Sequence, residues 1–366
     1  MRSIDSFSHH SQYHRPTEYL LTGTLNIVSP LNYPEWDAWI ATVPGATIFH
    51  SSHWARVLAE SYGYKPVYFT TGLSANPPVL LPMMEVSSFL TGNRGVSLPF
   101  SDNCKVLSPP TTSRNDVLEP VLDYGRRAAW RFVEFRDDAL FGEGDQYACC
   151  FYHHYVDLER DLEAHARTLK HGTRASLHKA IKEGARIRFS YSPESVDTYY
   201  QLNCLTRKRH GLPPQPLHFF RKIFEHLIAK KSGVVVEVVY HNRVIAAAVC
   251  LEFSRNVIMK YAAYDYAYQS VRPNNLLVWE TIRWYADHGF KILSFGRSDL
   301  KNEGLRRFKN AWNLVEEVVR YYKFDLKRNQ LIADSHPWID WSPRVMKNVP
   351  IPVLRMFGNV LYKHMG

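Results

Sequence analysis

The stretch VIMKYAAYDYAYQSVRPNNLLVWETIRWYADHGFKILSFGR, residues 257–297, has the order of signals expected of a strand–helix–strand unit. An apolar strand pattern at 257–261 leads into a polar loop at 265–273. Residues 274–288 then carry apolar side chains at helical spacing, and the glycine that follows is a stop signal. A second apolar strand pattern follows at 291–295. The stretch therefore predicts an α/β arrangement with two strands joined across one helix.

A similar series of signals occurs earlier in the chain. A strand pattern at 95–100, a helical pattern at 117–130 and a strand pattern at 131–136 are separated by comparable lengths of loop. A predicted hairpin precedes each series, at 66–84 and at 234–253. The matching hairpins favour an internal duplication over two unrelated α/β segments, since strand–helix–strand units are common. We therefore expect an α/β (α+β) protein with two tandem domains, each a mixed central sheet flanked by helices.

The length of 366 residues exceeds what one hydrophobic core usually serves, and it agrees with two domains. The sequence predicts a disordered N-terminal arm over 1–25 and a first domain over 26–165. A second domain that includes a basic connector is expected over 166–328, and a C-terminal tail over 329–366.

Composition narrows the class of protein. The hydrophobic fraction of 45% excludes a disordered chain, and the net charge of +10 predicts an anionic partner. The five cysteines are odd in number and contain no C-x-x-C pair, which argues against a disulfide framework and favours a reducing compartment. Neither a secretory signal nor an apolar run long enough to span a bilayer is visible, so a cytoplasmic protein is expected.

The junction between the loop and the helix at 272–277 is the strongest local candidate for a binding site. A helix that begins after a strand and a polar loop offers free backbone N–H groups and the positive end of its dipole to an anion. Arg272 beside this helix start would add a phosphate donor. Spacing alone favours the simpler interpretation, in which Pro273 and the two asparagines begin a helix well.

Two further basic segments stand out. Gly296-Arg297 ends a predicted strand, and Lys309 belongs to a short basic helix that follows. A cation at the end of a strand is well placed for a ligand, because open α/β sheets bind ligands there. The alternative is a solvated helix face anchored by neighbouring aromatic residues. The connector at 163–183 carries Arg174 and Lys179, and a solvated helix that also contacts a phosphate is its favoured interpretation.

Several functions lose support from missing motifs. The sequence has no G-x-S-x-G, Walker A or G-x-G-x-x-G pattern, which argues against hydrolase, P-loop and dinucleotide-binding folds. The pair His153-His154 lacks a third ligand at useful spacing, so no metal is expected. Nucleic acid is not an expected partner, because aromatic residues do not interleave with the charges of the connector.

Taken together, parts of the sequence resemble the GNAT acyltransferases, and in particular the Fem-type peptidoglycan aminoacyltransferases, which carry two GNAT-like domains in tandem. The resemblance covers about residues 30–325. In the second domain it is carried by the segments 234–253, 257–265, 272–277, 291–297 and 307–309. In the first domain and the connector it is carried by the segments 49–54, 97–100 and 174–180.

The resemblance implies two tandem GNAT-like domains that transfer an acyl or aminoacyl group to an amine. An acyl-CoA donor would place its pyrophosphate on Arg272, Asn274, Asn275 and Leu276. The acceptor amine must be deprotonated, and the resemblance leaves the choice of base open between two carboxylates, which are Asp265 and Glu280. An aminoacyl-tRNA donor is less favoured, because the long helical arm of the tRNA-dependent Fem enzymes has no counterpart in the second domain.

The leading hypothesis is an N-acyltransferase that modifies a cell-envelope or exopolysaccharide precursor. In this hypothesis Arg297 and Lys309 orient an anionic part of a substrate, while Arg174 and Lys179 line the cleft between the domains. An anionic small molecule or a lipid-linked precursor would be the acceptor. The alternative is a non-catalytic binding module for a nucleotide-sugar or polysaccharide precursor. It stays open because asparagines replace the usual glycines of the GNAT turn and the usual acidic tyrosine is missing.

The tail raises a separate alternative. Its apolar residues, interspersed with Lys347, Arg355 and Lys363, suit the surface of an anionic membrane, which would make the protein peripheral at the inner face. Packing of the tail against the second domain is the favoured interpretation.

Overall fold

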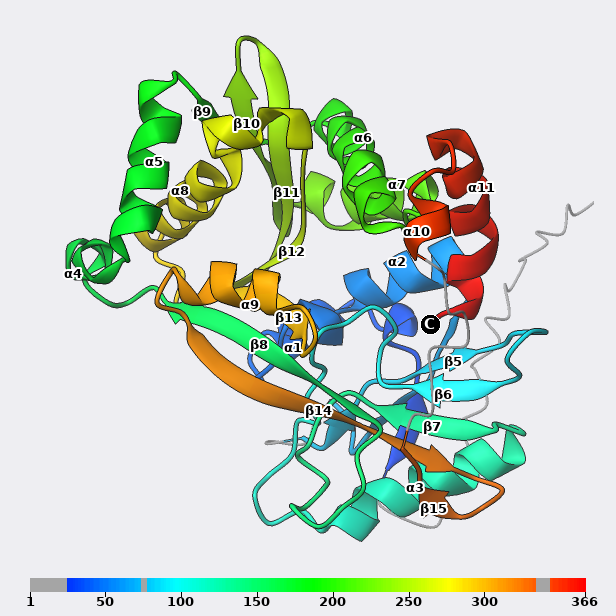
Figure 1. Cartoon of the computed structure of the whole chain (residues 1–366). Helices are drawn as coiled ribbons and strands as arrows, with labels where there is room; N and C mark the ends of the chain where they lie inside the picture. Colours follow the sequence, from blue (N-terminus) through cyan, green and yellow to red (C-terminus); the bar gives the residue numbers. More distant parts are fainter. Residues whose placement is uncertain (1–24, 74–77, 334–342) are drawn as a thin grey trace, which may run out of the picture.

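A mixed sheet of 12 strands runs through the whole molecule (Figure 1). The computed structural model describes residues 25–73, 78–333 and 343–366. Along the sheet the strands follow the order β2-β5-β6-β7-β14-β8-β13-β12-β11-β10-β9, with β15 paired to β14. In that order their bounds are Lys65–Pro66, Met84–Val86, Arg94–Val96, Phe132–Phe135, Val315–Asp325, Cys149–Asp157, Ile292–Asp299, Asn256–Tyr264, Arg243–Phe253, Gly233–Tyr240 and Arg186–Ser190, and β15 is Gln330–Leu331.

The two halves of the sheet repeat one pattern, as the sequence predicts. In the first half β6 and β7 are parallel neighbours joined across helix α3 (Arg114–Arg127). In the second half β12 and β13 are parallel neighbours joined across helix α8 (Pro273–Asp287). All the other strand pairs of the sheet are antiparallel. The fold is therefore α/β, with two halves of the same strand–helix–strand pattern in tandem.

Strands β8 and β14 join the two halves in a way that the sequence did not reveal. The two strands pair with each other, and β8 also pairs with β13 of the second half. The C-terminal part of β14 reaches back to pair with β7 of the first half. Each half is therefore completed by a strand that comes from the other part of the chain. The boundary between residues 165 and 166 stays a prediction, because β8 precedes it and yet lies beside the strands that follow it.

Helices cover both faces of the second half of the sheet. Helices α4 (Leu162–Thr168) and α5 (His171–Lys182) lie on the side of α8, whereas α6 (Pro193–His210) and α7 (Leu217–His226) lie on the side that faces the first half (Figure 1). The expected connector helix at 163–183 is thus two helices, which are separated where Leu169 adopts an extended backbone and becomes buried.

One hydrophobic core spans the junction of the two halves. It joins α2 (Ser52–Tyr62) of the first half to α6 and α7 of the second, with Trp54 against Phe219 at a ring separation of 6.2 Å. A second core lies between the sheet and α8, and a third lies between the first half of the sheet and α3. Since the shared core is extensive, the two halves are held in a fixed relation to each other.

The expected hairpin at 66–84 forms, but its strands are interrupted. The part nearest the turn, β3 (Tyr68–Thr70) with β4 (Leu80–Leu81), joins β1 (Asn26–Val28) in a separate three-stranded sheet. The part farther from the turn, β2 with β5, joins the large sheet. Pro82 lies between β4 and β5, where its missing N–H group ends the ladder.

The C-terminal tail packs against both halves through α11 (Ile351–Leu361) and the short 3-10 helix η5 (Tyr362–His364), which follow α10 (Pro343–Met346). The guanidinium of buried Arg94 donates to the backbone carbonyls of His364 and Gly366. Of the arm predicted at 1–25, residues 1–24 lie outside the described residues, as do residues 334–342 of the tail, whereas Leu25 is described and buried. Among the residues that are described, every helix is too short or too polar to cross a bilayer.

Candidate active site

The candidate site lies where the two central parallel strands of the second half separate. Strands β12 and β13 pair only over Asn256–Ile258 and Ile292–Ser294, and no further pairing joins them beyond these residues. The pairing of β13 with β8 also shifts its register between Ser294 and Arg297. Gly296, inside this irregular segment, has a φ of +62°, a backbone conformation that favours glycine. The separation leaves main-chain groups of β13 without strand partners.

Lys309 satisfies these main-chain groups. Its Nζ donates hydrogen bonds to the carbonyl oxygens of Phe295 at 2.7 Å and Gly296 at 2.9 Å. Helix α9 (Glu303–Asn310) carries the lysine, which is 6% exposed. Burial lowers the pKa of the Lys309 ammonium to about 8, although the charge of Asp102 partly opposes this effect. An amine with a pKa near the pH of the cell can serve as a hydrogen-bond donor or take part in proton exchange.

Asp102 comes from the first half of the chain and reaches the same place. Its Oδ1 lies 2.9 Å from Nζ of Lys260 on β12, and both side chains are less than a tenth exposed. Its Oδ2 is buried and has no hydrogen-bond partner among the described residues. A Cβ atom on Gly296 would lie 2.8 Å from this Oδ2, so the carboxylate fits only because residue 296 is glycine.

The charges around Asp102 keep it ionised. Burial raises the pKa of this carboxyl, but the neighbouring cations Lys260 and Arg297 outweigh burial and lower the pKa overall. Burial also lowers the pKa of Lys260, and its pairing with Asp102 opposes that shift only in part. The carboxylate is therefore a permanent acceptor in the junction.

A hydrogen-bonded network surrounds this pair. Arg297 donates to the hydroxyl of Tyr321 on β14 at 2.7 Å, and that hydroxyl donates to the backbone carbonyl of Asp102 at 2.6 Å. Arg136, which follows β7, donates to Glu134 at 2.8 Å and stacks on the ring of Tyr321. We call the charged members of this network the junction cluster. It consists of Asp102, Glu134, Arg136, Lys260, Arg297 and Lys309.

The junction cluster contains four cationic side chains and two carboxylates. A surplus of two positive charges in a mostly buried place is costly without a compensating anion. This imbalance predicts that the site receives an anionic ligand.

Two cavities open on either side of the Asp102–Lys260 pair. The first, of about 250 Å³, includes Asp102 and the last paired residues of the separating strands, Ile258 and Ser294, and has mainly apolar walls. The second, of about 260 Å³, includes Lys260 and the C-terminal part of α6, from which Arg207 projects. The ion pair therefore lies at the boundary between an apolar cavity and a cationic one.

The structure brings two of the sequence-predicted residues, Arg297 and Lys309, into the junction cluster. The two candidate bases lie elsewhere. Asp265 begins the 3-10 helix η4 (Tyr266–Val271) by accepting from a backbone N–H, and it pairs with Arg243 at 3.2 Å. Glu280 lies on α8 and pairs with the arginine three residues later at 2.6 Å, while burial raises its pKa.

The predicted phosphate-binding residues lie at the start of α8. Arg272 is exposed and has a left-handed backbone, with a φ of +63°. Asn274 and Asn275 are partly buried, whereas the side chain of Leu276 belongs to the core, so only its backbone could meet a ligand. No side chain caps this helix start. Pro273 has no N–H group, and that of Asn275 donates to the backbone carbonyl of Arg272 at 3.0 Å, so only the remaining N–H groups of the first turn are placed as an anion site would require.

The remaining predicted residues, Arg174 and Lys179, are exposed on α5, which packs against α8.

Sequence analysis missed the three residues Asp102, Lys260 and Tyr321 as site residues. One signal was available, because Lys260 interrupts an otherwise apolar strand pattern, which is unusual unless the lysine has a partner. No local signal indicated that the partner would come from a loop about 160 residues earlier.

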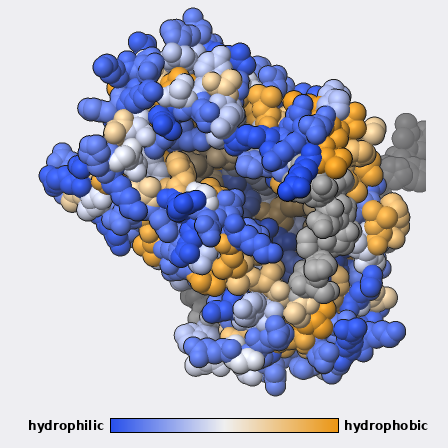
Figure 2. Space-filling model, viewed as in Figure 1, coloured by the Kyte–Doolittle hydropathy of each residue, from blue (hydrophilic) through white to orange (hydrophobic). Residues whose placement is uncertain are grey.

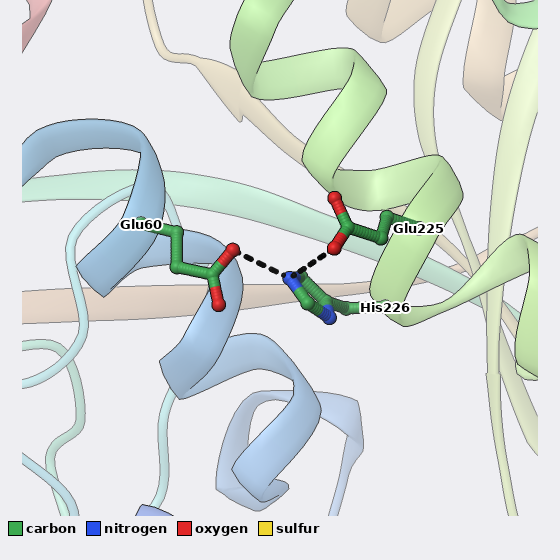
Figure 3. A group of neighbouring side chains, drawn as sticks. All are labelled: Glu60, Glu225 and His226. Carbon is green, nitrogen blue, oxygen red and sulfur yellow. Dashed lines mark hydrogen bonds and ion pairs between the residues drawn. The ribbon is translucent and has the colours of Figure 1, made fainter.

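One group of side chains in the described residues has the composition of a metal site. Glu60 on α2 and the neighbours Glu225 and His226 at the end of α7 place their ligand atoms within 4.8 Å of one another (Figure 3). Lys222 already lies 2.7 Å from each of the two carboxylates. The lysine supplies the positive charge that a metal would bring, so we interpret the group as an ion-pair link between α2 and α7.

Comparison with known proteins agrees with this geometry. Residues 167–310 match the protein family described as "Acetyltransferase (GNAT) domain". No curated protein matches the sequence of the chain. The fold is that of a tandem GNAT protein.

Three solved structures show the likeness over most of the chain. The structure titled "Crystal structure of FemX" has a TM-score of 0.61 at 12% identity and covers 78% of this chain and 94% of that one. A "tandem GNAT protein from the clavulanic acid biosynthesis pathway" has a TM-score of 0.52 at 9% identity, with 82% and 98% covered. The structure of "L-PGS from Bacillus licheniformis" has a TM-score of 0.50 at 15% identity, with 89% and 97% covered. The domain match supports acyl transfer as the chemistry, and the structural likeness extends the fold to both halves.

Proposed function

We propose that the protein is an N-acyltransferase that moves an acyl or aminoacyl group from an activated donor to an amine on an anionic acceptor. We further propose that the donor is an acyl-CoA and that the acceptor is a cell-envelope or exopolysaccharide precursor. The observation that carries the proposal is the separation of β12 from β13 in the segment that matches the GNAT domain, with Lys309 and Asp102 at the point of separation.

The junction offers the two groups that amide formation requires. The amine nitrogen attacks the thioester carbonyl carbon, a C–N bond forms, the C–S bond breaks, and the thiolate leaves. Asp102 is ionised and its Oδ2 has no hydrogen-bond partner among the described residues, so it can accept a hydrogen bond from the attacking amine, which loses its ammonium proton to solvent before the attack. Lys309 can stabilise the negative charge that develops on the carbonyl oxygen and can supply a proton to the leaving thiolate.

In this proposal the start of α8 binds the pyrophosphate of the donor. Arg272 and the uncapped N–H groups of the first helical turn would contact the phosphates. Each of the two cavities beside the Asp102–Lys260 pair would bind a different substrate. The cationic cavity near Arg207 suits the anionic acceptor, which also accounts for the positive surplus of the junction cluster.

Binding and transfer can be tested separately. Calorimetric titration of the full chain with acetyl-CoA is expected to show binding that Arg272→Ala weakens roughly tenfold, the effect of losing one charged hydrogen bond. The matched control is Arg283→Ala, an arginine on the opposite part of the same helix. Absence of heat with several acyl-CoA esters would contradict an acyl-CoA donor.

Transfer is measured as thiol release in the presence of amine-bearing nucleotide-sugars. Lys309→Met is expected to lower kcat/KM at least roughly 100-fold, the usual effect of removing an oxyanion donor. Lys301→Met, which changes an exposed lysine just before the same helix, serves as the control. Tight binding of donor and acceptor without any release of thiol would instead support the non-catalytic binding module.

A further inference from the structure

Helix α11 is apolar on more than the face that packs against the protein. Leu354 and Gly358 are buried, as expected for the side that faces the rest of the molecule. A second apolar stripe is exposed at helical spacing and consists of Val353, Met356 and Val360. Met356 is 57% exposed and Val360 is 52% exposed. Because a surface helix normally has one apolar face, a helix that is apolar on two sides is expected to be covered on both.

Other exposed apolar residues adjoin this stripe. The hairpin between β5 and β6 carries Phe89, which is 82% exposed, and the neighbouring Leu90. The ring of Phe89 lies 4.7 Å from that of His364 in η5, which places the hairpin beside exposed Met365. Figure 2 shows hydrophobic residues on the side of the molecule formed by α11 and this hairpin. We call this surface the tail patch. It consists of Phe89, Leu90, Val353, Met356, Val360 and Met365.

The two segments that carry the tail patch have charges of one sign. Residues 343–366 contain four Lys or Arg residues and no Asp or Glu. The hairpin residues 87–93 contain no charged side chain. Segments that combine exposed apolar side chains with cations and carry no acidic residue are complementary to a surface that is apolar below and anionic above.

A cavity at the edge of the patch has the same character. Its volume is about 330 Å³, and its wall includes Arg355 and Asn359 of α11 and Lys363 of η5. The facing wall includes His218 and the rings of Tyr62 and Tyr200, and none of the described residues that line the cavity is acidic. Its size and charge suit a phosphate-bearing headgroup.

We propose that the tail patch docks the protein onto the surface of an anionic phospholipid bilayer. The apolar side chains enter the boundary between headgroups and acyl chains, while Lys347, Arg355 and Lys363 contact lipid phosphates. Self-association through the same surface is disfavoured, since two copies would bring two acid-free sets of cations together. The proposal concerns a surface separate from the junction cluster and does not depend on acyl transfer.

Co-sedimentation with vesicles tests the proposal on the full chain. One set of vesicles is phosphatidylcholine alone, and the other contains phosphatidylcholine and phosphatidylglycerol in equal parts. The protein is expected to sediment with the anionic vesicles, less strongly as salt is added. Lys347→Gln with Lys363→Gln is expected to weaken partitioning roughly 30-fold. The control is Lys182→Gln, which removes an exposed lysine of α5.

A second variant removes apolar contacts and keeps the charge. Phe89→Ser with Met356→Ser is expected to weaken partitioning at least roughly tenfold. Ile181→Ser is the matched control, because Ile181 is 52% exposed but lies on α5. Unaltered melting temperatures would show that the variants are folded. Failure to sediment with anionic vesicles, or sedimentation that neither double variant changes, would overturn the proposal. A dimer in analytical ultracentrifugation that Phe89→Ser with Met356→Ser dissolves would also overturn it in favour of a second copy.

Discussion

Breaking the Asp102–Lys260 pair by removing one partner should destabilise the protein strongly, because the pair is buried where the two halves meet. Both side chains are less than a tenth exposed, and their charged atoms lie 2.9 Å apart. Removing one partner of a buried pair leaves an uncompensated charge and typically costs about 3–5 kcal/mol. We therefore expect Asp102→Asn and Lys260→Met each to lower the free energy of unfolding by about this amount.

The two variants should lose unequal amounts of unfolding free energy. Asp102→Asn leaves buried Lys260 unpaired and also removes the carboxylate 3.9 Å from the partly exposed Arg297, whereas Lys260→Met leaves Asp102 with Arg297 as a neighbouring cation. Asp102→Asn should thus cost more than Lys260→Met. At about 0.77 kcal/mol/K of unfolding entropy for a chain of this length, a loss of about 4 kcal/mol corresponds to a fall in Tm of roughly 5 °C.

A double-mutant cycle separates the pair from its surroundings. Urea unfolding of the wild type, both single variants and the double variant gives the four free energies. The double variant should be no less stable than Asp102→Asn alone, because it also removes the buried lysine that Asp102→Asn leaves unpaired. Single losses below about 1 kcal/mol, or two losses that add within about 0.5 kcal/mol, would refute the reasoning. Lys291→Met, which removes an exposed ion pair, is the control and should cost less than about 1 kcal/mol.

Three other predictions follow from the geometry. Gly296→Ala should destabilise the protein by at least about 1 kcal/mol in urea unfolding and lower transfer activity, because the φ of +62° strains alanine and the new methyl group displaces Asp102. The pKa of Lys309 is about 8 in the folded protein and 10.5 in a free lysine. Between pH 8 and pH 10.5 this lysine is therefore mostly protonated in the unfolded state and mostly neutral in the folded state. Stability of the wild type relative to Lys309→Met should therefore rise with pH from about 8 to about 10, by up to roughly 1.4 kcal/mol per pH unit, and a flat difference in urea unfolding would contradict the assigned pKa. Gly358→Ala should release α11 from the rest of the protein, because the new methyl group collides with a backbone carbonyl. Faster proteolysis of the tail should report this release. Gly304→Ala is the control and should have no such effect, because nothing lies closer than 3.8 Å to the new methyl group.

Much of the fold could be predicted because its signals are local. The strand and helix patterns of 257–297 become β12, α8 and β13, with bounds that differ by a few residues. Hydrophobic periodicity reports which side of an element is buried, so it also indicates that the series occurs twice. Hydrophobic periodicity cannot report which strands are neighbours in the sheet. The placement of β8 between β13 and β14 depends on backbone pairing over long separations in the chain.

The candidate site was predictable only in part, for the same reason. Arg297 and Lys309 follow the predicted strand within a few residues, so their proximity to its end was visible in the sequence. Asp265 and Glu280 also lie near these strands along the chain, but in the structure they form local ion pairs with Arg243 and with the next turn of α8.

The sequence by itself determined the class of fold, the duplicated strand–helix–strand units and the basic character of the second half. These depend on spacing along the chain, which is present before folding. Only the tertiary structure decided that Asp102 meets Lys260 where β12 and β13 separate, and that four cations share two carboxylates there. That meeting requires the first half to be held against the second by a common core, and no local pattern encodes which surfaces of the two halves will face each other.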